Sequence, residues 1–294
     1  MNSHLIEAAR RAGLTVPAGP LDEAALGELA SALYLRPART RRPPREEGYL
    51  EAAQPFTLAS PAGGLAAWSW GAAGRPLVVL VHGWEGRGSQ LGSLAVPLVA
   101  AGFRVVTFDG PAHGDSPGEE ASVPLLAQVI AGLPAQLGPV HAVAGHSLGA
   151  AGAALATTLG LAPRGLVFYA PPLWQRGRLD YAAGRMQLSP AATRAFFAGV
   201  ERRTAWPLER VDMRVVARAA PCPLVVFHDP GDADTDYAGS EELVALWPGA
   251  RLVPCPGRGH NRILTTPEVI AATVRFVAVL PRPASGLPRP SSGV

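Results

Sequence analysis

Apolar and polar positions alternate in blocks between about residues 54 and 280. Leu77–Val81 is a continuous apolar run, typical of a strand covered on both faces. Amphipathic stretches separate such runs, so the pattern predicts an α/β fold with a mostly parallel eight-stranded sheet and helices on both faces. The expected strands are a hairpin at 54–60 and 65–70, then 77–81, 103–108, 140–145, 165–170, 224–228 and 251–253, and the expected helices are 89–101, 120–137, 149–159 and 267–279.

Three segments depart from this pattern. Residues 1–50 predict an N-terminal extension with short helices at 3–12 and 21–34, followed by an Arg/Pro stretch. Residues 172–219 have no buried strand and predict a small helical lid inserted into the domain of residues 51–280. The Pro, Gly and Ser of 281–294 predict a disordered tail.

Composition supports a folded body. Of 294 residues, 48% are hydrophobic and 17% charged, which is enough for a sizeable core. The net charge is +3 and every basic residue is arginine. Five arginines fall between Arg36 and Arg45, which fits either a nucleic-acid patch or a solvated segment packing on the body. We favour the second interpretation and expect no nucleic-acid partner.

The low number of cysteines and the N-terminal sequence favour a cytoplasmic enzyme. The two cysteines, Cys222 and Cys255, make no disulfide framework, and we expect no bridge between them. Pro17, Gly19 and Pro20 interrupt any apolar signal-peptide core. No apolar run is long enough to predict a membrane span.

The strongest chemical signal is Gly145-His146-Ser147-Leu148-Gly149, a G-x-S-x-G between an apolar strand and an Ala-rich helix. A nucleophilic serine in this setting sits in a sharp turn, where a Cβ at either glycine would collide with the neighbouring strand or helix. The other interpretation is a Gly-rich turn with an ordinary serine. The strand before it and the helix after it favour Ser147 as a nucleophile.

A serine needs a base to remove its proton, and the base follows it in the chain if the order is Ser, acid, His. Only His228 and His260 follow Ser147. His228 ends a predicted strand and is expected to pack against the sheet. His260 follows the last strand in a Gly-rich loop before a helix, so His260 is the predicted base.

Four aspartates crowd the loop after the seventh strand. Asp232 is placed past the strand end, 28 residues before His260, and is the predicted acid of the triad. Asp229 is close enough to the strand to accept backbone amides. Asp234 and Asp236 are expected to cap the next helix or to face water.

Attack by Ser147 creates an oxyanion that needs two donors. One is the backbone N–H of Leu148, the residue after the nucleophile. The other is the backbone N–H of Trp84, in the loop that follows His82-Gly83. Trp84 can also pack through its side chain without conflict.

These motifs stand in one order: HGW at 82–84, DGPAHGDS at 109–116, GHSLGA at 145–150, HDPGD at 228–232 and GHNRIL at 259–264. With them the chain resembles the α/β-hydrolase superfamily over about residues 54–280. The resemblance implies that fold, the triad Ser147–Asp232–His260, and a place near the site for His113. The family pattern H-G-x-x-D-x-x-V-P is only partly kept, because Asp229 replaces the Gly and Thr235-Asp236 replaces Val-Pro.

The resemblance implies a serine hydrolase acting on a small-molecule ester, with no metal and no cofactor. Carboxylic ester hydrolysis is the broadest choice. An acyltransferase or thioesterase on the same triad, and a non-catalytic ligand-binding protein of this fold, stay open. The lid aromatics either line a pocket for small to medium esters or only hold the lid to the body, and we favour the pocket. The residues expected to line it are His113, Trp174, Phe196 and Phe197.

Overall fold

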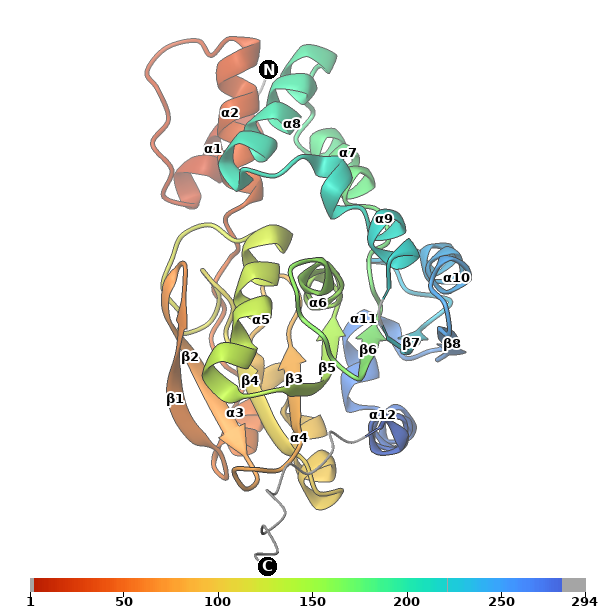
Figure 1. Cartoon of the computed structure of the whole chain (residues 1–294). Coiled ribbons are helices and arrows are strands. Elements are labelled where there is room, and N and C mark those ends of the chain that lie inside the picture. Colours follow the sequence, from red (N-terminus) through yellow and green to blue (C-terminus); the bar gives the residue numbers. More distant parts are fainter. Residues whose placement is uncertain (1–2, 221, 282–294) are drawn as a thin grey trace, which may run out of the picture.

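The computed structural model describes residues 3–220 and 222–281, built around one eight-stranded sheet (Figure 1). Its strand order is β1-β2-β4-β3-β5-β6-β7-β8. The pairs β1–β2 and β2–β4 are antiparallel, and the remaining neighbours are parallel. The strands are β1 Gln54–Ser60, β2 Gly63–Trp70, β3 Leu77–Val81, β4 Arg104–Phe108, β5 Val140–His146, β6 Gly165–Tyr169, β7 Leu224–His228 and β8 Arg251–Pro254.

Helices cover both faces of the sheet. On one face α5, α6, α9 and α10 enclose a core centred on the central strands, and on the other α4 and α12 enclose a second core. Strands buried on both faces explain the uninterrupted apolar runs in the sequence. The bounds are α4 Gly92–Ala100, α5 Val123–Leu137, α6 Leu148–Thr158, α9 Met213–Arg218, α10 Tyr237–Leu246, α11 Gly259–Arg262 and α12 Pro267–Val279, with 3-10 turns η1 Gly88–Leu91, η2 Leu208–Val211 and η3 Ile263–Thr265.

A separate helical layer stands at one end of the molecule (Figure 1). It comprises α1 Ser3–Arg11, α2 Glu23–Tyr34, α7 Gln175–Arg185 and α8 Pro190–Thr204, which we call the cap. The cap has its own apolar cluster, with Leu26, Leu29 and Phe196 at its centre. The helices α2 and α8 cross closely at Gly27, where an added Cβ would lie only 2.4 Å from the Cβ of Ala195. Glycine at this position therefore permits the close packing of the two helices. The N-terminal helices and the inserted helices therefore form one packed layer.

Between the cap and the sheet the chain runs as an extended segment into α3 Pro44–Leu50. Two of its arginines, Arg39 and Arg42, bind the body. Arg39 donates to the carbonyls of Gly114 and Gly118, and Arg42 pairs with Asp115. This agrees with the interpretation of the Arg/Pro stretch as a segment packed on the body.

The eight-stranded sheet and its parallel order are confirmed, and each predicted strand lies within a few residues of the observed one. Cys222 precedes β7 and Cys255 follows β8; the strands pair in parallel, and both thiols are free. No helix within 3–220 and 222–281 is long and apolar enough to cross a membrane. Of the predicted tail 281–294, all but Pro281 lies outside the described residues.

Candidate active site

Ser147 sits at the turn between β5 and α6, at the carboxyl end of the central strand. Its backbone has φ 49° and ψ −116°, a strained conformation for a residue with a side chain. The turn is possible because its flanks carry no Cβ. A Cβ on Gly145 would lie 2.6 Å from the carbonyl oxygen of Gly149, and one on Gly149 would lie 2.4 Å from that of Val81. The strain is local and presents the Ser147 side chain above the strand end.

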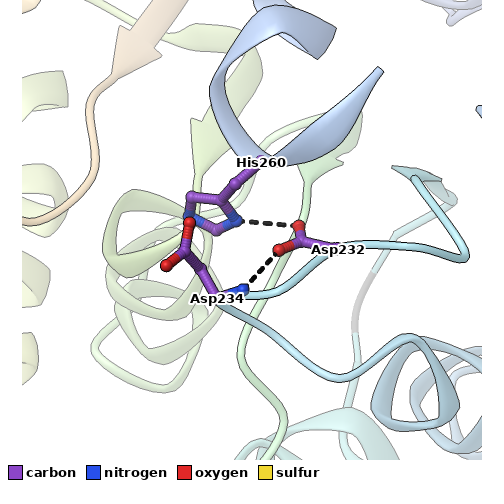
Figure 2. Close-up of side chains that lie close together, drawn as sticks. All are labelled: Asp232, Asp234 and His260. Carbon is purple, nitrogen blue, oxygen red and sulfur yellow. Dashed lines mark hydrogen bonds and ion pairs between the residues drawn. The ribbon is translucent and has the colours of Figure 1, made fainter. Parts of the chain in front are cut away.

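Asp232 and His260 form a hydrogen-bonded pair beside this turn (Figure 2). His260 lies in the short helix α11, and its Nδ1 is 2.8 Å from Oδ2 of Asp232. The Asp232 side chain has no exposed surface. Burial alone would raise the pKa of Asp232, but hydrogen bonds from His228 and His260 outweigh it and hold the pKa far below the usual value. Asp232 is therefore a carboxylate at neutral pH.

Two further side chains, not predicted from the sequence, complete the surroundings of Asp232. His228 Nε2 lies 3.3 Å from Asp232 Oδ2, and its Nδ1 lies 2.7 Å from the hydroxyl of Ser240. Thr235 Oγ1 lies 3.2 Å from Asp232 Oδ2 and 3.3 Å from His260 Nδ1. The only signal for them in the sequence is their spacing of four and three residues from Asp232.

His260 is held against the nucleophile turn by His146. The Nε2 of His146 lies 3.0 Å from the backbone oxygen of His260, and the two rings are 4.7 Å apart. Since burial lowers the pKa of His146 to about 3, its ring is neutral. The residue next to Ser147 thus fixes where His260 stands.

The other aspartates of this loop have different surroundings. Asp229 accepts the amides of Gly231 and Gly259, as expected from its place near the strand, and the Gly259 bond leads in lowering its pKa. Asp236 caps α10 through the amide of Ala238. Asp234 donates its backbone amide to Asp232 and carries its carboxylate beside the His260 ring (Figure 2).

The group Asp232, Asp234 and His260 is compact enough to hold a metal ion, since one ligand atom of each lies within 4.8 Å of the others. However, Asp232 and His260 already satisfy one another through the Nδ1–Oδ2 bond. The arrangement is what a serine triad requires of its acid and base.

The loop after β3 lies directly against the nucleophile turn. A Cβ on Gly83 would be 2.9 Å from Nδ1 of His146 and 3.1 Å from Cβ of Ser147. His82 anchors the loop: its Nδ1 lies 2.7 Å from the Gly83 carbonyl, and its Nε2 accepts the Gly110 amide at 2.8 Å. Among the turns, loops and helix caps of the described residues, the backbone amides of Trp84 and Leu148 donate no hydrogen bond to a backbone carbonyl.

A cavity of about 1150 Å³ opens onto Ser147 between the sheet and the cap. Its wall is mostly apolar and comes from three parts of the chain: the end of α2, the body, and the segment of residues 172–219. Among its lining side chains are Tyr34, Trp84, Val123, Leu148, Trp174 and Trp206. The cavity can accept an apolar group beside the hydroxyl of Ser147.

The four predicted pocket residues fall in different places. Trp174 lines the cavity, as expected. Phe196 is completely buried in the cap and Phe197 packs edge-on against it, so neither is a cavity residue in the described structure. His113 is buried behind Trp84, in edge contact with its ring. The helical period turns both phenylalanines toward other helices, whereas Tyr34, far away in sequence, takes the wall position.

The sequence profile of the alpha/beta hydrolase family matches residues 78–273, two thirds of the chain and the part that carries Ser147, Asp232 and His260. The chain belongs to the alpha/beta hydrolase family. No curated protein sequence matches it.

Solved structures of this alpha/beta hydrolase fold are similar at low identity. A monoacylglycerol lipase from Paleococcus ferrophilus is 23% identical with a TM-score of 0.58, and the match covers 73% of this chain and 98% of that one. Naproxen esterase from Bacillus subtilis is 15% identical with a TM-score of 0.61, covering 88% and 99%. The thioesterase domain from the curacin biosynthetic pathway is 19% identical with a TM-score of 0.57, covering 77% and 99%. These likenesses show the shared fold.

The buried histidines predict acid sensitivity. Burial lowers the pKa of His82 to about 4 and of His113 and His146 to about 3. In the unfolded chain they titrate near 6.5, so below that pH the unfolded state binds more protons. The free energy of unfolding should fall as pH drops below about 6.5, by up to ~1.4 kcal/mol per pH unit for each histidine. Urea unfolding at pH 7.5, 6.5 and 5.5 measures this. His113→Gln should reduce the slope of the unfolding free energy against pH, whereas the control His4→Gln, at an exposed site, should leave that slope unchanged. Equal slopes in the wild type and His113→Gln would show that burial of this histidine does not cause the acid sensitivity.

Proposed function

We propose that the protein is a serine hydrolase that cleaves carboxylic esters of small molecules through an acyl-enzyme on Ser147. The observation that carries the proposal is the buried Asp232–His260 hydrogen bond of 2.8 Å, placed against a strained serine turn that lines a cavity. Membership of a hydrolase family, with an esterase, a lipase and a thioesterase among similar structures, supports the reaction class.

The triad acts by moving one proton. Asp232 accepts the Nδ1–H of His260, which leaves Nε2 of that ring as the basic nitrogen. As Ser147 Oγ bonds to the ester carbonyl carbon, its proton passes to Nε2 of His260. The ionised, desolvated Asp232 stabilises the imidazolium that forms, and the proton then leaves with the alcohol. Water repeats the sequence on the acyl-enzyme and restores Ser147.

Negative charge develops on the carbonyl oxygen during both steps. The amides of Trp84 and Leu148 are the donors we assign to it, because Gly83 brings the Trp84 loop within contact of Ser147 and Leu148 opens α6. The amino end of α6 adds a favourable partial charge. Two fixed donors of this kind require no rearrangement as the charge forms.

The cavity supports an ester with an apolar group as the substrate. Its wall of Tyr34, Trp84, Trp174 and Trp206 fits an apolar acyl or alcohol group, and its volume of about 1150 Å³ admits a small to medium ester without enclosing a polymer.

Ser147→Ala should abolish turnover, because no other hydroxyl stands at the turn. Hydrolysis of p-nitrophenyl acetate and butyrate measures it, with thermal unfolding as the check that the fold persists. A variant retaining a rate near that of the wild type on any ester would rule out Ser147 as the nucleophile.

Asp232→Asn should lower kcat by about 10⁴, since an amide at this position favours the wrong tautomer of His260. Asp234→Asn is the matched control: the same change two residues away, at an exposed carboxylate outside the hydrogen bond to Nδ1, should leave kcat within a few-fold. If Asp234→Asn is the more damaging of the two, the assignment of the acid is wrong.

Tyr34→Ala and Trp174→Ala should change the dependence of kcat/KM on acyl length. Burial of each methylene contributes ~0.8 kcal/mol, about a fourfold effect on kcat/KM. Loss of wall area should therefore lower kcat/KM more for long esters than for short ones. The measurement is kcat/KM for acyl chains of increasing length. Phe197→Ala, in the cap but off the cavity wall, should give a profile parallel to the wild type. Parallel profiles for all three variants would show that the wall does not select the acyl chain.

A further inference from the structure

Residues 36–46, which run from the end of α2 into the first turn of α3, lie across the loop that follows β3. We call this segment the strap. The amide of Ala38 donates to Oε1 of Glu85 at 3.0 Å, one residue after Trp84. Two residues further, the guanidinium of Arg87 donates to the carbonyls of Thr40 and Arg41, each at 3.0 Å. The strap therefore contacts the loop at successive positions beyond its assigned oxyanion donor.

Arg87 is a buried side chain that depends on the strap. It is 6% exposed and is paired with Glu46, itself 5% exposed, at 3.7 Å. Glu46 also accepts the hydroxyl of Ser89 at 2.8 Å. A buried guanidinium without acceptors is costly, so the loop can keep Arg87 inside only while the strap supplies its carbonyls and the Glu46 carboxylate.

Glu85 has a backbone conformation that needs support. Its φ is 56°, in the left-handed region that residues with a side chain avoid. It directly follows Trp84, so its conformation decides the course of the chain that leaves the donor amide. The Trp84 ring is itself stacked on Tyr34 at the end of α2, with centroids 6.5 Å apart and planes at 20°. The N-terminal segment thus touches both the donor residue and the strained residue after it.

We infer that the strap positions the oxyanion hole: it holds the Trp84 amide in place through Glu85 and Arg87. This rests on the proposed function, in which Trp84 supplies one of the two donors. Glu85 and Arg87 are positioning residues in this scheme, since they act through the conformation of the loop. The N-terminal segment is then part of the catalytic apparatus, although it lies outside the residues matched by the family profile.

The test uses Glu85, whose exposure allows substitution without unfolding. Glu85→Ala removes the acceptor of the Ala38 amide and should lower kcat about tenfold with KM within twofold, because a displaced donor costs less than the 10²–10³ of a lost one. Glu85→Gln keeps an acceptor oxygen and should retain a kcat near that of the wild type. Glu119→Ala is the control, since it removes another exposed carboxylate that pairs with the strap, at Arg36, away from the loop.

The second readout is inhibition by an alkyl boronic acid, whose tetrahedral adduct on Ser147 places an oxygen in the oxyanion hole. The inhibition constant of the boronic acid should rise in Glu85→Ala by the same factor by which kcat falls. It should stay unchanged in Glu85→Gln and Glu119→Ala. Unchanged kcat in Glu85→Ala, a rise in KM alone, or an equal loss in Glu85→Gln would overturn the inference. A wild-type protein that neither cleaves esters nor binds the boronic acid would instead refute the proposed function, and this inference with it.

Discussion

A carboxylate removed from water must be satisfied by donors, and Asp232 is the group around which this site is organised. Its side chain has no exposed surface, and it accepts hydrogen bonds from the amides of Asp234 and Thr235 and from the ring of His260. These donors lie in the loop after β7 and in α11. The hydrogen bonds to the Asp232 carboxylate therefore hold this loop and α11 in place relative to each other. His260 in turn binds His146, which precedes Ser147. The burial of one charge thus holds Asp232, His260 and the turn at Ser147 close together.

The central strands place these groups at one edge of the sheet. The turn at Ser147, the loop carrying Asp232 and the loop carrying Trp84 follow β5, β7 and β3, which run in parallel. The close approach of Gly83 and Gly149 to their neighbours lets the loops come together without a gap. The cap then closes the space above them, leaving a cavity with an apolar wall.

Much of this was predictable from the sequence because it depends on local chemistry. Ser147, Asp232 and His260 stand in motifs whose strand and turn residues are contiguous, and Asp229 binds backbone amides as its place near the strand implies. The cavity wall was less predictable. Phe196 and Phe197 are aromatic and lie in the insertion, yet which way a helix turns them depends on α2, more than 160 residues earlier. Tyr34 takes the wall position for the same reason, and no local pattern marks it. Likewise, the sequence predicts only that His228 packs on the sheet. Its contact with Asp232 depends on the fold of the loop after β7, which no local pattern predicts.

The proposed reaction requires that Ser147 forms a covalent acyl intermediate. The most direct measurement is the intact mass of the protein after rapid mixing with p-nitrophenyl butyrate and an acid quench, followed by peptide mapping. We expect an added butyryl mass on the peptide containing Ser147, appearing at the rate of the initial burst of p-nitrophenol release. A burst of p-nitrophenol with no adduct on the protein, or an adduct on another residue, would rule out an acyl-enzyme on Ser147.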